Sequence, residues 1–258
     1  MEILIPILLL AVIGLIAGIG LSLASKFMAV PVDEKQEKIR EVLPGANCGA
    51  CGYSGCDGYA AAVAAGEAEP NKCAPGGETA AKALAELLGV TVESKPKVAF
   101  VGCNGTPECI VQRFNYQGME SCAAANQIHG GPNACGFGCL GYGDCMRVCP
   151  FNAITLENGR PVICSDVCVG CGKCADACPK SLISLIPKET KVRVGCSNKQ
   201  RGAAVVKACS VSCIGCMQCE KNCPNGAVKV VDNVAVIDYE LCDGCGTCST
   251  VCKRNVFC

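Results

Sequence analysis

An uncharged apolar run opens the chain. No Asp, Glu, Lys or Arg occurs from Ile3 to Ser25, with Glu2 before the run and Lys26 after it. As a helix, this run would extend roughly 34 Å at about 1.5 Å per residue, enough for a hydrocarbon core of roughly 30 Å. We therefore expect a single transmembrane helix, an anchor over residues 1–26. A cleaved signal peptide is the alternative, but it needs a basic start and a shorter apolar run.

Basic residues follow the apolar run within a short distance. Lys26, Lys35, Lys38 and Arg40 all lie on its C-terminal side. Basic residues beside a membrane span favour the cytoplasmic side, and acidic residues between them count for little. We therefore expect a single-pass protein of the cell (inner) membrane, with its soluble part on the cytoplasmic side.

Three helices are predicted in the next 65 residues. A charged linker, residues 27–46, has helical character over Asp33–Leu43 and is then broken by Pro44 and Gly45. Asp57–Ala68 is rich in alanine and predicts a short helix. Thr79–Leu88 predicts another, with Leu84, Leu87 and Leu88 on one face.

Two hairpins are predicted in the second half. Strands at residues 153–156 and 160–163 flank Asn158-Gly159, a strong tight-turn signal. Strands at residues 227–231 and 234–237 flank Asp232-Asn233 in the same way. Short helices combined with local hairpins predict the α+β fold class.

Cysteine is the residue that changes this picture, because the chain has 27 of them. Three runs read C-x2-C-x2-C-x3-C, a spacing that suits [4Fe–4S] clusters and iron–sulfur chemistry. Pro150, Pro179 and Pro224 directly follow the closing Cys of a run, as in bacterial ferredoxins. A disulfide scaffold is disfavoured by the odd count, and zinc usually binds two separated Cys pairs instead. The iron–sulfur interpretation also implies a reducing compartment.

A separate four-cysteine unit follows the linker. Its spacing is C-x2-C-x4-C-x16-C, and its glycines let the backbone wrap closely. We expect residues 47–90 to form a small helical [4Fe–4S] domain, with zinc as the alternative metal. The predicted ligands are Cys48, Cys51, Cys56 and Cys73.

From residue 135 the chain repeats the plan of a two-cluster bacterial ferredoxin. We expect two tandem 2[4Fe–4S] ferredoxin-like units at residues 135–190 and 213–258, in which the closing Cys of each run binds the neighbouring cluster. The second unit then has one cluster on Cys213, Cys216, Cys219 and Cys252, and another on Cys223, Cys242, Cys245 and Cys248. In the first unit, one cluster takes Cys149, Cys168, Cys171 and Cys174.

The remaining cluster of the first unit is irregular. Tyr142 stands where the spacing predicts a cysteine, between Cys139 and Cys145. With Cys178 as the remote ligand, Cys135 is the expected replacement, four residues before Cys139. A three-cysteine or degenerate site is the alternative.

Seven cysteines remain, five of them in the connecting segments 91–134 and 191–212. Val101-Gly102-Cys103 and Val194-Gly195-Cys196 are alike and each ends a short apolar strand. We expect a sixth cluster, in addition to the five above, against the alternative of four buried free thiols. Its predicted ligands are Cys103, Cys122, Cys196 and Cys209, and Cys109, Cys164 and Cys258 have no assigned role.

Other functions have little support. The 23 basic and 23 acidic residues balance, so no charge field indicates nucleic acid. No dinucleotide fingerprint opens a helix, so we expect no flavin or nicotinamide on this chain. The single histidine, His129, is expected in a loop or on the surface, and no catalytic set stands out.

The order of these segments resembles the B subunit of the Rnf complex, a membrane-bound, ion-translocating ferredoxin:NAD oxidoreductase. The resemblance covers nearly the whole chain, and two ferredoxin units are typical of clostridial-type members. The motifs that carry it are Asn47-Cys-Gly-Ala-Cys-Gly-Tyr-Ser-Gly-Cys56-Asp-Gly-Tyr59, Cys73-Ala-Pro-Gly-Gly77, Ser121-Cys-Ala-Ala-Ala125 and Cys139-Leu-Gly-Tyr-Gly-Asp-Cys145.

The resemblance implies an electron relay with no substrate-converting site of its own. It implies that soluble ferredoxin donates electrons, that membrane subunits accept them, and that a flavin-bearing subunit elsewhere reduces NAD. The alternatives are a subunit of another membrane reductase or hydrogenase, and a zinc-bound, membrane-tethered interaction module.

Overall fold

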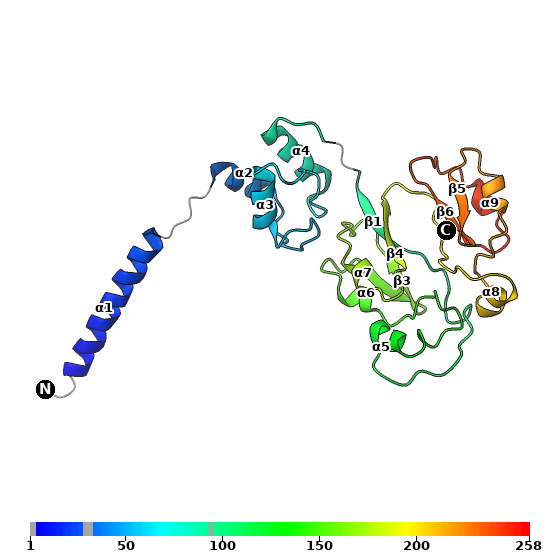
Figure 1. The fold of residues 1–258 in the computed structure, drawn as a ribbon, viewed down its shortest axis with the longest axis horizontal. Helices are drawn as coiled ribbons and strands as arrows, with labels where there is room; N and C mark the ends of the chain where they lie inside the picture. Colours follow the sequence, from blue (N-terminus) through cyan, green and yellow to red (C-terminus); the bar gives the residue numbers. More distant parts are fainter. Residues whose placement is uncertain (1–3, 28–32, 93–94) are drawn as a thin grey trace.

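The structure is a computed structural model that describes residues 4–27, 33–92 and 95–258, with side chains in the first helix described at residues 12–23. Figure 1 shows one long helix, a helical part and a larger part that contains all the described strands. The helices are α1 Leu4–Phe27, α2 Glu34–Val42, α3 Cys56–Ala64, α4 Gly77–Leu88, α5 Cys122–Gln127, α6 Asp144–Arg147, α7 Lys173–Asp176, α8 Ala203–Ala208, α9 Gln218–Lys221 and α10 Thr247–Thr250. The strands are β1 Lys97–Val101, β2 Ile154–Glu157, β3 Arg160–Ile163, β4 Ile183–Pro187, β5 Val228–Val231 and β6 Val234–Ile237.

Helix α1 covers most of the stretch predicted as an anchor, residues 1–26, of which residues 1–3 lie outside the described residues. Its described side chains include several exposed large apolar groups, among them Leu15 and Leu21. No helix within the described residues combines the length and the apolar character needed to cross a membrane.

A compact core of its own supports the helical part. Helix α2 begins where predicted, because the Asp33 carboxylate caps it by accepting a hydrogen bond from the Lys35 N–H at 3.0 Å. Ile39, Tyr59 and Leu84 are at most 1% exposed and pack into one cluster from three helices. On the face predicted to carry Leu84, Leu87 and Leu88, only part is buried, since Leu87 is 38% exposed. Burial shifts instead toward the alanines beside Leu84, because small side chains let the helices approach.

Both predicted hairpins are confirmed. Strand β2 pairs antiparallel with β3, and β5 pairs antiparallel with β6. The turn residues have positive φ throughout: 48° at Asn158, 67° at Gly159, 49° at Asp232 and 67° at Asn233. Two left-handed residues in a row define the turn that matches strand twist, which explains the Asn, Asp and Gly at these positions.

The β1–β4 pair is a long-range feature that local patterns do not reveal. Lys97 pairs with Pro187 and Val101 with Ile183, which attaches the segment before the first unit to the end of that unit. A similar, shorter pairing closes the second unit. There Arg193 and Cys258 exchange two backbone hydrogen bonds, at 2.8 and 3.0 Å, and Val194 lies opposite Phe257. Each unit therefore recruits a segment that precedes it.

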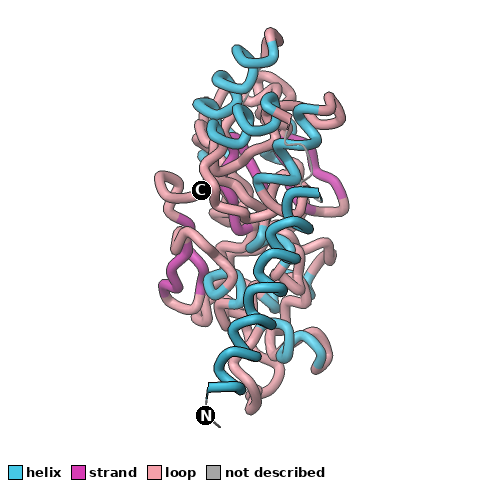
Figure 2. Tube along the Cα trace, turned by 90° about the vertical axis from the view of Figure 1, so that its left-hand side faces the viewer, coloured by secondary structure: helices cyan, strands magenta, loops and turns pink. Residues whose placement is uncertain are grey.

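Much of the buried core in the strand-containing part is cysteine. Figure 2 shows that loops, rather than helices or strands, form most of this part. The core around the second unit includes Cys213, Cys219 and Cys248 beside small aliphatic residues such as Val228 and Val234. Strands of four residues and single-turn helices bury little apolar surface. The geometry of the cysteine groups therefore determines what holds these units together.

Candidate iron–sulfur sites

Most of the described cysteines gather into groups, two of which line hollows. No three described His, Cys, Asp or Glu side chains converge closely enough to hold a single metal ion. Most thiols of these groups are buried or half-buried. Burial raises the pKa values of Cys73 and Cys209, and neighbouring thiols raise them further. Crowded thiolates repel one another, so a positively charged iron core is what such a donor set fits.

The helical site is the group of four cysteines in the helical part. All of them line one hollow, together with Tyr59 and Pro75. Burial raises the pKa of Cys73, and the nearby thiols raise it further. Its members are Cys48, Cys51, Cys56 and Cys73.

Two polar side chains shape this site. The Asn47 amide oxygen accepts a hydrogen bond from the Cys56 N–H at 2.8 Å, and Asn47 itself adopts a left-handed φ of 45°. The Tyr59 hydroxyl donates to the Glu69 carbonyl at 2.7 Å and accepts from the Lys72 N–H at 3.2 Å. Burial raises the pKa of Tyr59 to about 12, so the hydroxyl stays protonated. These bonds hold the loop that delivers Cys73.

The irregular site of the first unit has a different fourth cysteine from the expected one. A mostly apolar hollow is lined by four cysteines: Cys122, Cys139, Cys145 and Cys178. Burial raises the pKa of Cys145 to about 11, and the thiols of Cys122 and Cys178 contribute to that rise. Cys135, the ligand expected from spacing, does not line this hollow.

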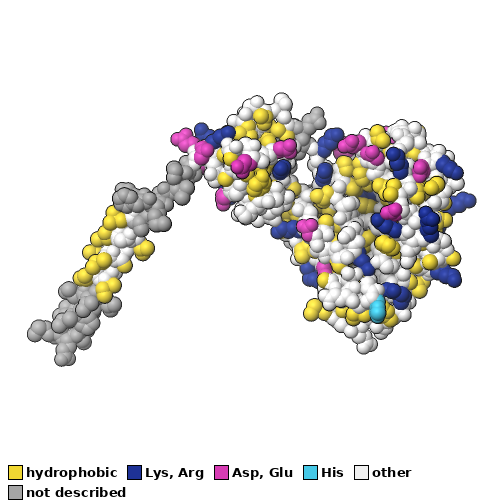
Figure 3. All heavy atoms as spheres, in the orientation of Figure 1, with side chains coloured by type: hydrophobic (Ala, Val, Ile, Leu, Met, Phe, Trp, Pro, Cys, Tyr) yellow, Lys and Arg dark blue, Asp and Glu magenta, His cyan; other side chains and the backbone are white. Residues whose placement is uncertain are grey.

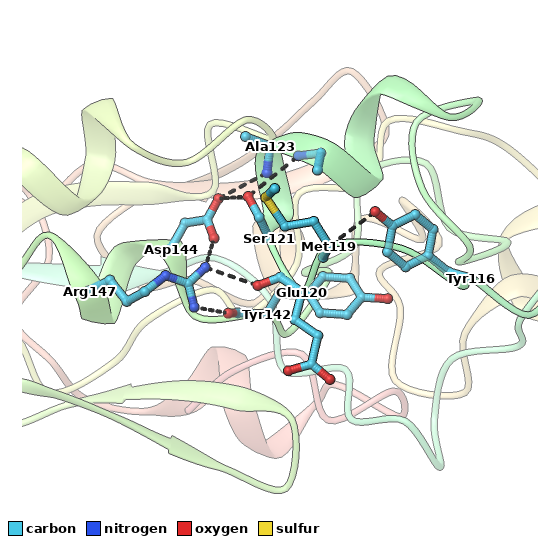
Figure 4. Close-up of polar contacts among 9 residues, drawn as sticks. Tyr116, Met119, Glu120, Ser121, Ala123, Tyr142, Asp144 and Arg147 are labelled. Atoms are coloured by element: carbon cyan, nitrogen blue, oxygen red, sulfur yellow. Dashed lines mark hydrogen bonds and ion pairs between the residues drawn. The ribbon is translucent and has the colours of Figure 1, made fainter.

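Asp144 is the residue that places Cys122 in the hollow. Its carboxylate accepts hydrogen bonds from the Ser121 hydroxyl at 3.0 Å and from the Ala123 N–H at 2.9 Å (Figure 4). The same carboxylate pairs with Arg147 one turn later. The residues on both sides of Cys122 are therefore hydrogen-bonded to Asp144, which directly precedes Cys145.

Tyr142 does not line this hollow, and its contacts stabilise the surrounding loop. Its ring lies 5.6 Å from the ring of Tyr116, measured between centroids, and its carbonyl accepts from Arg147 at 2.8 Å. Figure 4 shows the Tyr142 carbonyl and the Asp144 carboxylate converging on Arg147. The loop therefore replaces the missing cysteine with a second chain segment.

Removing the Asp144 carboxylate should empty the irregular site. For Asp144→Ala we expect the loss of about four iron atoms per chain, because the hydrogen bonds that hold the start of α5 are lost and Cys122 leaves the hollow. Asp144→Asn should retain most of the iron, since its amide oxygen still accepts a hydrogen bond. Iron and sulfide determinations on anaerobically prepared protein measure both.

Asp166→Ala is the matched control, because the Asp166 side chain is 89% exposed and its ion pair with Lys188 spans a long 3.7 Å. Full iron content in Asp144→Ala would contradict the role of Cys122 in this site.

The Cys149 site is held by the long-range strand. Its four predicted members are Cys149, Cys168, Cys171 and Cys174, whose thiols lie near one another. Burial raises the pKa of Cys174 to about 12, with the Cys168 and Cys171 thiols adding to it. The Ala99 N–H in β1 donates to the Cys168 sulfur at 3.4 Å, and the Ala153 N–H donates to the Cys149 sulfur at 3.4 Å.

The second unit has contacts of the kind that the predicted exchange of closing cysteines requires. The predicted Cys213 site consists of Cys213, Cys216, Cys219 and Cys252, and the predicted Cys242 site consists of Cys223, Cys242, Cys245 and Cys248. Burial raises the pKa of Cys213, to which the remote Cys252 thiol contributes, and likewise that of Cys248, to which Cys223 contributes. Cys216 and Cys245 are exposed.

A further group lies between the two units, and we call it the bridge group. It consists of Cys103, Cys135, Cys196 and Cys209. Burial raises the pKa of Cys209 to about 11, with all three other thiols of the group contributing. Compared with the expected sixth site, Cys135 takes the place of Cys122. The exchange arises because Cys122 is tied to Asp144 while Cys135 turns toward the other unit.

The three unassigned cysteines lie apart from these groups. Cys164 and Cys258 are exposed. Cys109 is half-buried, and the Thr106 hydroxyl, which donates to its sulfur at 3.3 Å, lowers the pKa of this thiol. His129 is exposed in a loop, as expected, and its carbonyl accepts from Arg113.

The helical site lies next to the first unit. Burial raises the pKa of Cys171, and the thiols of Cys149 and then Cys48 raise it further. A cleft between the helical part and the first unit is lined by Cys73 on one side and Cys168 on the other, among several lysines. Cysteines of two sites thus face each other across this junction.

Some of these supporting residues have no signal in spacing. Asp144 and Asn198 act through contacts with distant segments, and nothing in the local pattern marks them. The similar segments that end in Cys103 and Cys196 do carry a usable signal. Their apolar residues predict short strands, and each such strand closes a unit.

Comparison with known families matches the same three regions. Residues 43–75 match the family described as "Putative Fe-S cluster". Residues 131–179 and 212–256 match two families that are both described as "4Fe-4S dicluster domain". Together with the cysteine groups, these matches define an iron–sulfur electron-transfer protein built from ferredoxin-type units.

Relatives that extend along almost the whole chain are B subunits of oxidoreductase complexes. The B subunit of the proton-translocating ferredoxin:NAD(+) oxidoreductase complex of Clostridium ljungdahlii is 43% identical, covering 96% of this chain and 89% of that protein. The chain belongs to this family, the B subunits of the Rnf complexes. The B subunit of the Na(+)-translocating complex of Acetobacterium woodii is also 43% identical, over 98% of this chain and 77% of that protein. The B subunit of the ion-translocating oxidoreductase complex of Methanosarcina acetivorans is 38% identical, over 96% of this chain and 95% of that protein.

Proposed function

We propose that this chain accepts electrons from soluble ferredoxin and passes them to membrane subunits of an ion-translocating ferredoxin:NAD oxidoreductase complex. The observation that carries the proposal is the series of thiol groups, which extends from exposed Cys216 and Cys245 to the helical site beside Cys171. The names of the relatives, which include both proton- and Na(+)-translocating complexes, support the same role.

The proposed cofactors are [4Fe–4S] clusters in five sites. Four sites keep the ligands expected from the spacing of the runs: the helical site, the Cys149 site, the Cys213 site and the Cys242 site. In the irregular site, Cys122 is proposed as the fourth ligand in place of Cys135, because it lines the hollow with the other three cysteines. The proposed domain boundaries follow the sequence prediction, except that β1 joins the first unit by pairing with β4.

When bound, such clusters supply one-electron redox chemistry over a wide range of potentials. The chain contributes the thiols, the buried surroundings and hydrogen bonds to sulfur. The N–H groups of Ala99, Ala153 and Leu182 each lie 3.4 Å from a cysteine sulfur in the first unit. Such bonds stabilise a negatively charged sulfur and so favour the reduced state of the site.

The proposed location is the cell membrane, with the charge-free run from Ile3 to Ser25 as the single-pass anchor and the remaining domains on the cytoplasmic side. Figure 3 shows apolar side chains over the middle of α1 and basic side chains distributed over the part that contains the strands. Exposed apolar surface of this kind requires an apolar partner, and the charge-free run from Ile3 to Ser25 fits a bilayer. Flavin-bearing subunits of the same complex are the proposed route to NAD.

Deleting residues 1–26 tests both parts of the proposal. The truncated chain should leave the membrane fraction, keep its iron and still lose visible absorbance when reduced ferredoxin is added without oxygen. The full-length complex should show the same bleaching and go on to reduce NAD. If reduced ferredoxin does not bleach either protein although dithionite does, the proposed donor is wrong. A truncated chain that stays in the membrane fraction contradicts the anchor.

A further inference from the structure

The bridge group lies outside the regular ligand pattern of both units. Three of its members, Cys103, Cys196 and Cys209, also lie outside the segments that match iron–sulfur families. We propose that Cys103, Cys135, Cys196 and Cys209 bind a further [4Fe–4S] cluster that connects the two ferredoxin-type units. This inference goes beyond the proposed function, because it does not depend on which protein donates the electrons.

Backbone pairing brings the first two thiols together. The N–H of Asn104, directly after Cys103, donates to the carbonyl of Gly195, directly before Cys196, at 2.8 Å. The hydroxyl of the residue after Cys196 donates to the carbonyl of the residue before Cys103 at 2.9 Å. The two cysteines therefore face each other at the centre of a short antiparallel contact.

A three-segment ladder delivers the other two thiols. The Val111 N–H donates to the Ala208 carbonyl at 3.0 Å, and the Ala134 N–H donates to the Val111 carbonyl at 2.7 Å. Ala208 and Ala134 directly precede Cys209 and Cys135. A single segment thus holds both cysteines, although they are far apart in the sequence.

The surroundings suit a cluster. Cys103, Cys135 and Cys209 are at most 8% exposed. Burial raises the pKa of Cys135, the thiols of Cys103 and Cys196 raise it further, and the ammonium group of Lys180 lowers it. The alternative is that these thiols are free and pack as small hydrophobic side chains. A cluster requires four thiols to converge, here from four segments. Packing alone does not require such convergence.

A buried amide provides a second, independent observation. Asn198 is 1% exposed, and its side-chain NH₂ group donates to the Cys135 sulfur at 3.5 Å. Its amide oxygen accepts from the Gln200 N–H at 2.8 Å, which fixes the orientation of the group. Hydrogen bonds from fixed donors to ligand sulfur orient the ligand and tune the potential of a cluster.

Two further hydrogen bonds connect the bridge group with its neighbours on each side. The N–H of Cys139, in the irregular site, donates to the Cys103 sulfur at 3.4 Å. The N–H of Cys213, in the second unit, donates to the Cys196 sulfur at 3.3 Å. A cluster here would accept one electron from a reduced neighbouring site and pass it to an oxidised one, with no bond formed or broken.

Iron counting on the anaerobically reconstituted full chain tests the site. Cys135→Ala should lose about four iron atoms per chain, and Cys135→Ala combined with Cys196→Ala should lose the same four, because both belong to one cluster. Cys135→Ala combined with Cys122→Ala should lose about eight, because these residues belong to different clusters. Cys164→Ala, which changes an exposed thiol, is the control and should lose none.

Unchanged iron in Cys135→Ala, or additive losses in the variant that also lacks Cys196, would overturn the proposal. Asn198→Leu covers the case in which the cysteine variants fail to fold. It should keep all the iron and shift the midpoint potential of one cluster in an EPR-monitored redox titration. Potentials that are all unchanged in this variant would also count against the site.

Discussion

Replacing Cys51 by alanine should lower the rate at which the assembled complex reduces NAD to the background rate. The helical site is the thiol group that adjoins the first unit through Cys171, on the side of the chain that leads to α1. With that site empty, electrons would have no cluster between the first unit and the membrane partners. Ferredoxin should still reduce the sites of both units, which EPR on the complex can measure separately from NADH formation.

The control for this change is Cys164→Ala, which also removes one sulfur but from an exposed residue. Its NAD reduction should match that of the parent complex. The helical part should remain folded in Cys51→Ala, because Ile39, Tyr59 and Leu84 form a core without the cluster. A normal rate of NAD reduction in Cys51→Ala would exclude a linear route through the helical site.

Removal of iron by a chelator should unfold the second unit and leave the helical part largely folded. The second unit has strands of four residues and helices of four residues, and cysteines make up much of its core. Two-stranded hairpins and single helical turns are marginal in water without further packing. In contrast, α4 has 12 residues and shares an apolar core with α2 and α3.

Hydrogen exchange followed by mass spectrometry measures this difference. Peptides from residues 213–258 should exchange at close to unfolded-chain rates after chelation, while peptides from α4 should keep most of their protection. Protein incubated without chelator provides the control. Retained protection across β5 and β6 after complete iron loss would show that side-chain packing alone stabilises the unit.

Local chemistry in the sequence is sufficient to predict several elements. Asn158-Gly159 and Asp232-Asn233 predict hairpins because few residue types adopt two consecutive left-handed conformations, and both turns have that geometry. Asp33 predicts the start of α2, where it caps the helix. The exchange of closing cysteines is predicted from run spacing alone, because in two-cluster ferredoxins the fourth cysteine of such a run binds the other cluster.

The irregular site shows where local spacing fails. Cys135 is the nearest spare cysteine in sequence to the gap left by Tyr142, but distance along the chain does not determine direction in space. The ion pair and hydrogen bonds of Asp144 bring Cys122 into the hollow, although it lies 17 residues before Cys139. Contacts between segments decide which cysteine lines the hollow, and no periodicity in the sequence records such contacts.

The β1–β4 pair escapes prediction for a related reason. Its strands are separated by the whole first unit, and each is only five residues long. Local propensity cannot choose a partner at that separation, because pairing depends on how the intervening unit folds. The similarity of the segments before Cys103 and Cys196 is visible in the sequence, but its meaning depends on the strand ends that they pair with.

The exposure of Cys216 and Cys245 has a consequence for survival in air. Oxidation of cysteine sulfur begins with accessible thiolates and proceeds from reversible to irreversible products. These two residues are exposed, whereas Cys56 and Cys73 of the helical site are buried. Oxygen damage should therefore begin in the second unit and reach the helical site last. The accessibility that suits a site to meet an electron donor also makes it the first site to fail under oxidative stress.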